Sequence, residues 1–103
     1  MKRALLALLL AGCATNPAVT SVSGMTEYGT EVTLFDAPCQ TAVILDRIQE
    51  EHQASYRAGR AEFKGEVRLL CWRLAREHGI VFVIDDTGVM GGVPLAAFGG
   101  SVL

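Results

Sequence analysis

The chain of 103 residues lacks several features that would assign it directly to a functional class. Its longest unbroken apolar run covers residues 4–11, far fewer than the roughly 20 residues that span a bilayer. Its three cysteines and two histidines do not have the spacing of metal ligands. Basic residues are also not in excess, since nine lysines and arginines accompany eleven aspartates and glutamates. We therefore expect no metal or other cofactor and no nucleic-acid binding through a basic surface.

The N-terminus has the pattern of a secretory signal peptide. Lys2 and Arg3 form a basic start, residues 4–11 are apolar, and small residues follow. We expect residues 1–12 to be removed on export. The 91 residues that remain carry a formal net charge of −4 with histidine neutral, and they are enough for one small domain.

The residues around the expected cleavage point, Leu10, Ala11, Gly12 and Cys13, resemble the lipobox of bacterial lipoprotein precursors at all four positions. The resemblance implies signal-peptidase recognition of the first three, a diacylglyceryl group on the sulfur of Cys13, and cleavage before it. A thiolate is the nucleophile that this thioether chemistry needs. Ala14 follows instead of aspartate, which implies the outer membrane, facing the periplasm, in a Gram-negative cell. The alternative is an ordinary secretory signal with a cysteine in its cleavage region.

Two cysteines remain if Cys13 carries lipid. Exported compartments are oxidising, so we expect Cys39 and Cys71 to form a disulfide. A bond that closes this loop of about 33 residues would stabilise the fold by about 3.5 to 4 kcal/mol in the chain-entropy model. The alternative is a pair of free buried thiols.

The rest of the chain divides into two parts. Residues 13–30 are small and rich in hydroxyl groups, and we expect a lipidated N-terminus followed by a flexible tether. Residues 31–103 are expected to fold as one small domain, because periodic apolar residues begin there.

We expect this domain to have an α+β fold, in which one helix packs on a small antiparallel sheet. The apolar stripe of Ile44, Ile48 and Tyr56 predicts a helix over about residues 41–56. Short runs rich in β-branched and aromatic residues, with short connections, predict a meander of about three to five strands. These runs are residues 31–35, 60–63, 66–74, 80–85, 89–90 and 93–95. The disulfide would staple the helix start to the sheet.

Two arrangements of residues resemble catalytic groups. Asp86, Thr87 and Gly88 resemble the catalytic loop of retroviral-type aspartic proteases, but only fifteen residues follow Gly88, whereas that family has a full β-domain there. A tight hairpin turn accounts for the same residues. Cys71, His78 and Asp85 could be cast as nucleophile, base and orienting group, but the expected disulfide would consume the thiol. We therefore expect no enzymatic activity.

A binding surface is the remaining hypothesis. Trp72 is the sole tryptophan, and it either fills the core or forms part of a binding surface with Arg68 and Arg73. Much of the mature chain, from residues 33–39 to Phe98, also looks like a type of small uncharacterised lipoprotein of bacteria and phages, for which no activity carries over. We expect an anchored, non-enzymatic module that binds an envelope protein. The alternative is a phage-derived lipoprotein that blocks a receptor or inhibits an envelope enzyme.

Overall fold

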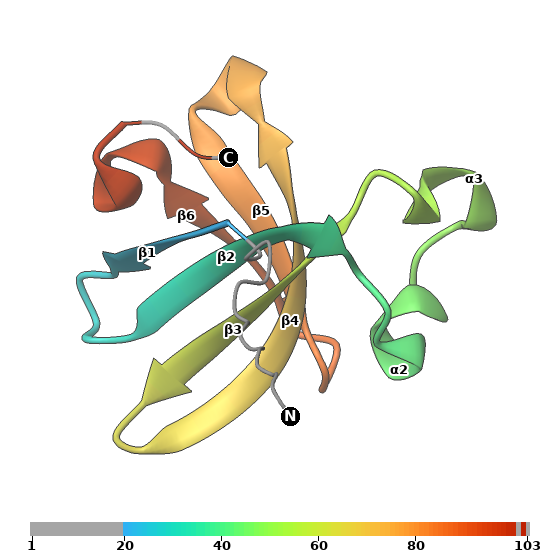
Figure 1. Cartoon of the computed structure of the whole chain (residues 1–103), viewed down its shortest axis with the longest axis horizontal. Coiled ribbons are helices and arrows are strands. Elements are labelled where there is room, and N and C mark those ends of the chain that lie inside the picture. Colours follow the sequence, from blue (N-terminus) through green and yellow to red (C-terminus); the bar gives the residue numbers. More distant parts are fainter. Residues whose placement is uncertain (1–19, 101, 103) are drawn as a thin grey trace, which may run out of the picture.

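The computed structural model describes residues 20–100 and residue 102. This part of the chain contains six strands, two α-helices of four residues each and two 3-10 helices. The strands are β1 (Ser21–Met25), β2 (Glu31–Pro38), β3 (Arg57–Phe63), β4 (Glu66–Ala75), β5 (Ile80–Asp85) and β6 (Met90–Pro94). The helices are α2 (Ala42–Leu45), α3 (Glu50–Gln53), η1 (Arg76–His78) and η2 (Leu95–Phe98). Figure 1 shows their arrangement.

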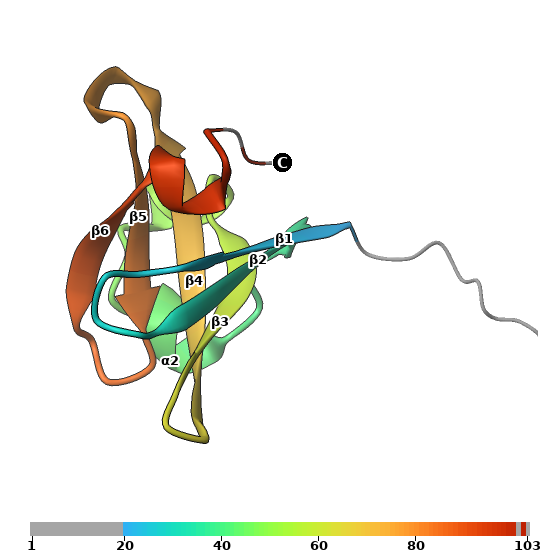
Figure 2. The ribbon, with the colours of Figure 1, turned by 90° about the vertical axis from the view of Figure 1, so that its left-hand side faces the viewer.

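The six strands form one antiparallel sheet in which each strand pairs with its neighbour in sequence. The sheet curls into a half-barrel (Figures 1 and 2), so that β1 and β6 are its two edges. The 3-10 helix η2 follows β6 and contacts both β6 and β1. One short helix therefore bridges the two edges that the sheet leaves unpaired.

The inner face of the curl holds the larger core. Alternation along each strand directs every second side chain inward, and Leu34 and Val81 are fully buried there. Phe98 of η2 packs against the same cluster and covers one end. The cluster consists of Val32, Leu34, Leu70, Trp72, Val81, Val93 and Phe98.

Trp72 also forms hydrogen bonds at a place where the pairing of the strands is irregular. The pairing of β2 with β3 shifts between Leu34 and Pro38, which leaves extra residues on β2. The indole nitrogen of Trp72 donates to the carbonyl oxygens of Phe35 at 3.2 Å and Ala58 at 2.9 Å. A buried tryptophan N–H group needs such an acceptor. In turn, it provides a hydrogen-bond donor for carbonyl groups beside the register shift.

A second core lies on the outer face, beneath the segment that carries α2 and α3. Its buried members are Cys39, Ile44, Ile48, Tyr56, Cys71 and Ile84. The disulfide between Cys39 and Cys71 is present, with Cα atoms 5.6 Å apart, and this confirms the expected pairing. The bond joins the start of the segment to the central strand β4.

The expected fold class is wrong. The domain is predominantly a six-stranded curled sheet, and residues 41–56 form two single-turn helices where one long helix was predicted. The reason is that the Cys39 amide donates to the Tyr56 carbonyl at 3.1 Å, so the two ends of this segment are adjacent. A continuous helix over residues 41–56 would hold its ends about 22 Å apart. The apolar stripe is nevertheless buried, because Ile44, Ile48 and Tyr56 all reach the outer core.

The segment expected to be a tether is also partly structured. Strand β1 lies within residues 13–30 and pairs with β2 along its whole length. The hydroxyls of Ser23 and Thr33 are 2.9 Å apart across this pair. Gly24 allows η2 to approach, since a Cβ atom at this position would lie 2.8 Å from the Ala97 carbonyl carbon and from Phe98 Cδ1. Hydroxyl-rich strands with little apolar side chain resemble linkers in sequence, which explains the error.

Candidate ligand-binding pocket

A cavity of about 670 Å³ opens between the α2–α3 segment and the outer face of the sheet. Its floor comes from β4, β5 and β6, and its wall comes from residues 47–56. Its lining includes the polar or aromatic side chains of Arg47, His52, Tyr56, Arg73 and Phe82. We call this cavity the outer pocket.

The outer pocket is positively charged. Arg47 and Arg73 line it, and no aspartate or glutamate does. Neither arginine forms an ion pair with any residue in the described ranges. Glu50 and Glu51 belong to the same segment but do not contribute to the lining. Two guanidinium groups are therefore free to bind a ligand.

The aromatic side chains and the sheet position these cations. The guanidinium carbon of Arg73 lies 5.5 Å from the ring centroid of Phe82, its partner across β4 and β5. The rings of Tyr56 and Phe82 meet edge to face, with centroids 6.4 Å apart. Arg47 packs on the β5–β6 turn, since a Cβ atom at Gly88 would lie 2.7 Å from its Nη1 atom. Arg73 thus lies over β5, and Arg47 lies against the turn that follows it.

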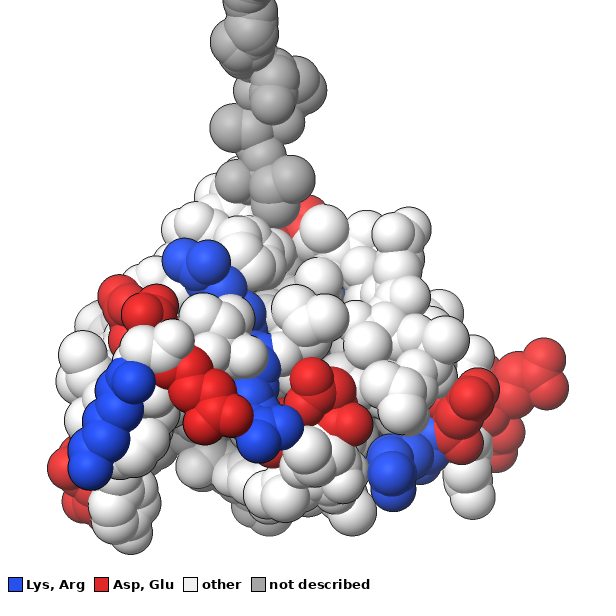
Figure 3. Space-filling view, turned by 90° about the horizontal axis from the view of Figure 1, so that it is seen from below, with Lys and Arg blue, Asp and Glu red and all other residues white. Residues whose placement is uncertain are grey.

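One side of the molecule carries charged side chains of both signs. On the side of the molecule shown in Figure 3, basic and acidic side chains are interspersed and neither sign forms a continuous patch. That side of the molecule therefore has no broad surface potential that would attract a ligand.

The structure separates the three residues of the expected binding surface. Trp72 is only 2% exposed and lies in the inner core, so it is a core residue and not part of a surface. Arg68 lies on the same face of β4, at the rim, and contacts Glu66 at 3.2 Å and Asp86 at 3.4 Å. Arg73 lies on the opposite face and lines the outer pocket. Only Arg73 of the three belongs to the candidate site.

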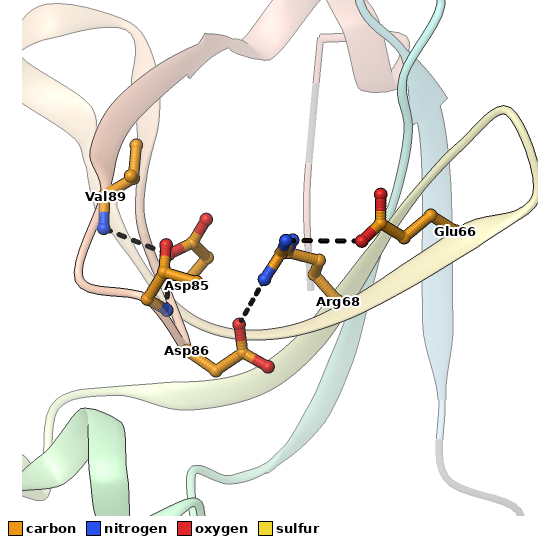
Figure 4. Close-up of polar contacts among 6 residues, drawn as sticks. Glu66, Arg68, Asp85, Asp86 and Val89 are labelled. Atoms are coloured by element: carbon orange, nitrogen blue, oxygen red, sulfur yellow. Dashed lines mark hydrogen bonds and ion pairs between the residues drawn. The ribbon is translucent and has the colours of Figure 1, made fainter.

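The Asp-Thr-Gly sequence forms the turn between β5 and β6, as Figure 4 shows. The Asp85 carboxylate accepts hydrogen bonds from the Thr87 amide at 2.8 Å, the Thr87 hydroxyl at 2.6 Å and the Val89 amide at 3.0 Å. Gly88 has φ +92°, which favours glycine. These contacts give Asp85 and its neighbours a structural role in a tight turn.

The turn also sets the pKa of Asp85. Burial alone would raise the pKa of this carboxyl group. The hydrogen bonds from Thr87 and Val89, together with the nearby Arg68 guanidinium, outweigh burial and lower the pKa below its ordinary value of 3.8. Asp85 is therefore ionised at neutral pH and holds the turn in that form.

The other arrangement that resembles a catalytic site, Cys71 with His78 and Asp85, has no free thiol group. Cys71 is bonded to Cys39 and is fully buried. His78 lies in η1, with its Nε2 atom 4.0 Å from the Glu77 carboxylate, and both side chains are exposed. Within residues 20–100 and at residue 102, no group of three or more potential metal ligands is found.

The residues of the expected lipobox, Leu10, Ala11, Gly12 and Cys13, lie outside the described residues. None of the helices in the described part of the chain has the length and apolar character to cross a bilayer. A scan against protein-family models found no match, and neither did searches of the curated proteins and of the solved structures.

Sequence reasoning missed most of the outer pocket. From the sequence, Tyr56 is placed only in a helix stripe, and Arg47 is not identified as a site residue. One signal was present: alternation in β4 places Arg73 on the same face as Cys71, and the expected bond from Cys71 to Cys39 brings residues 41–56 over that face. The pairing of Arg73 with this segment could have been inferred from these two facts.

Proposed function

We propose that the chain is the precursor of an exported lipoprotein, held to a membrane through lipid on Cys13, whose domain is a non-enzymatic binding module of the cell envelope. The order of Lys2 and Arg3, the apolar run 4–11 and the lipobox is the observation that carries the proposal. The Cys39–Cys71 disulfide supports it, because such bonds persist in oxidising compartments. The location proposed is the outer membrane, facing the periplasm, in a Gram-negative cell.

The position of β1 limits how far the domain would extend from the membrane. Ser21, where β1 begins, lies eight positions after Cys13 in the chain. Even a fully extended chain of that length spans at most about 29 Å. The domain would therefore lie close to the headgroups, which suits a role at the membrane surface.

Metabolic labelling with palmitate tests the anchor. The wild-type protein should incorporate label and sediment with membranes, whereas Cys13→Ala should do neither. The double variant Cys39→Ala/Cys71→Ala is the matched control, because it also removes sulfur but retains Cys13 and should still be labelled. Label that persists in Cys13→Ala would refute the lipid assignment.

The binding role is tested separately with tagged protein in detergent-solubilised envelope. A specific envelope protein should be recovered with the wild type after cross-linking. If no partner is recovered while the protein remains folded by circular dichroism, the proposed protein-binding role is wrong.

A further inference from the structure

We propose that the outer pocket binds a phosphate group carried by a partly apolar small molecule. This goes beyond the anchored binding role proposed above, because it concerns a ligand site on the folded domain that does not involve Cys13. The lining has charge, hydrogen-bond donors and apolar surface in one cavity, and each of these restricts the ligand.

Charge complementarity requires an anion. Arg47 and Arg73 contribute two permanent positive charges to a cavity without a lining carboxylate. The protein as a whole has a net charge of −2, so the charge of this arginine pair is opposite in sign to the net charge. Within the described residues both arginines lack an ion-pair partner, whereas Arg57 pairs with Asp36 and Arg68 pairs with both Glu66 and Asp86.

The origin of the donors on separate elements favours phosphate over carboxylate. Arg47 enters from the turn between α2 and α3, Arg73 from β4, and Ser55 and Tyr56 from the segment before β3. A carboxylate presents two oxygens in one plane and suits a single guanidinium. A phosphate presents oxygens in several directions and suits donors that come from separate elements.

Tyr56 provides a further donor. It is only 8% exposed, and in the described part of the chain its hydroxyl forms no hydrogen bond with another residue. Tyr56 lines the outer pocket, and a ligand oxygen bound there would accept a hydrogen bond from its hydroxyl group.

The remaining lining determines what the phosphate is attached to. Phe82, Ile84 and Met90 give the cavity an apolar floor, and Met90 is 65% exposed beside it. The volume of about 670 Å³ lies in the range of small-molecule sites and exceeds the needs of a phosphate alone. Two sources share this chemistry: a soluble organic phosphate, or the headgroup of a phospholipid from the membrane to which Cys13 would attach the domain.

The test is a titration of the full chain, purified in a non-ionic detergent, with phenyl phosphate, followed by amide chemical shifts. Shifts should saturate and should concentrate on Arg47, Arg73 and the β5–β6 turn. The Arg47→Gln and Arg73→Gln variants should each bind about tenfold more weakly. Arg76 is an exposed arginine outside the pocket, so Arg76→Gln removes the same charge and should bind as the wild type does.

Several results would overturn the proposal: no saturable shift, benzoate binding as tightly as phenyl phosphate, or an equal loss in Arg76→Gln. Circular dichroism checks that each variant is folded, and Arg47 is exposed, so its replacement leaves both cores intact. A parallel titration with a water-soluble short-chain phosphatidylglycerol distinguishes the sources. Tighter binding of the lipid identifies a headgroup site, and tighter binding of phenyl phosphate identifies a soluble ligand. Because Cys13 takes no part, Cys13→Ala should bind phenyl phosphate unchanged, whatever the outcome of palmitate labelling.

Discussion

Removal of the Cys39–Cys71 disulfide should destabilise this domain more than any single surface change. The bond closes a loop with a sequence separation of 32 residues, which contains α2, α3 and β3. Chain entropy for a loop of this size gives about 3.7 kcal/mol at 25 °C. The stability of a small domain is about 5 to 15 kcal/mol, so this is a large fraction of the total.

The appropriate variant replaces both cysteines with alanine, so that no buried free thiol or hydroxyl is created. Cys71 is fully buried and Cys39 is 7% exposed, so the missing sulfur atoms also remove some packing in the outer core. We expect a total loss of about 3 to 5 kcal/mol and a fall in Tm of about 15 to 30 °C.

Urea unfolding, followed by the fluorescence of the buried Trp72, measures this loss. The m-value should rise in the variant, because an unfolded chain without the cross-link exposes more surface. Val43→Ala is the control within the same loop, since Val43 is 47% exposed and its truncation should change stability by less than about 0.5 kcal/mol. A loss below about 1 kcal/mol in the double variant would refute the loop-closure reasoning.

Three further changes test other parts of the fold. Asp85→Asn should lower the free energy of unfolding by about 1 kcal/mol at pH 7. Because the pKa of Asp85 is lowered in the folded state, the difference from wild type should vanish as pH falls below 3.8 through that pKa. A difference in urea unfolding that does not depend on pH would contradict this. Gly24→Ala should lower Tm, because the added Cβ atom would collide with the Ala97 carbonyl. Gly91→Ala is the control and should not lower Tm, because the space around Gly91 is open. Equal Tm values for the two variants would disprove the close approach of η2 to Gly24. Trp72→Phe should cost about 2 to 3 kcal/mol in urea unfolding, because it leaves carbonyls without a donor and a void, and a neutral effect would exclude that role.

The sequence predicted the sheet better than the segment that covers it. The runs predicted at residues 66–74 and 80–85 correspond to β4 and β5, and Lys64-Gly65 forms the short connection between β3 and β4, with positive φ at both residues. These signals are local, since side-chain alternation and turn geometry depend on a few consecutive residues. The strand β1 was missed because its residues, Ser-Val-Ser-Gly-Met, contain little apolar side chain, and its pairing with β2 and contact with η2 stabilise it.

The sequence by itself determined the disulfide, the antiparallel order of the strands and the burial of Ile44, Ile48 and Tyr56, because cysteine count, short connections and apolar spacing are properties of the chain alone. Only the tertiary structure decided that the segment bearing those residues bends back on itself, since that depends on the contact between Cys39 and Tyr56. The same bend brings Arg47 and Arg73, which are far apart in sequence, to one cavity. The candidate site is therefore a product of long-range contacts, which no local pattern in the sequence encodes.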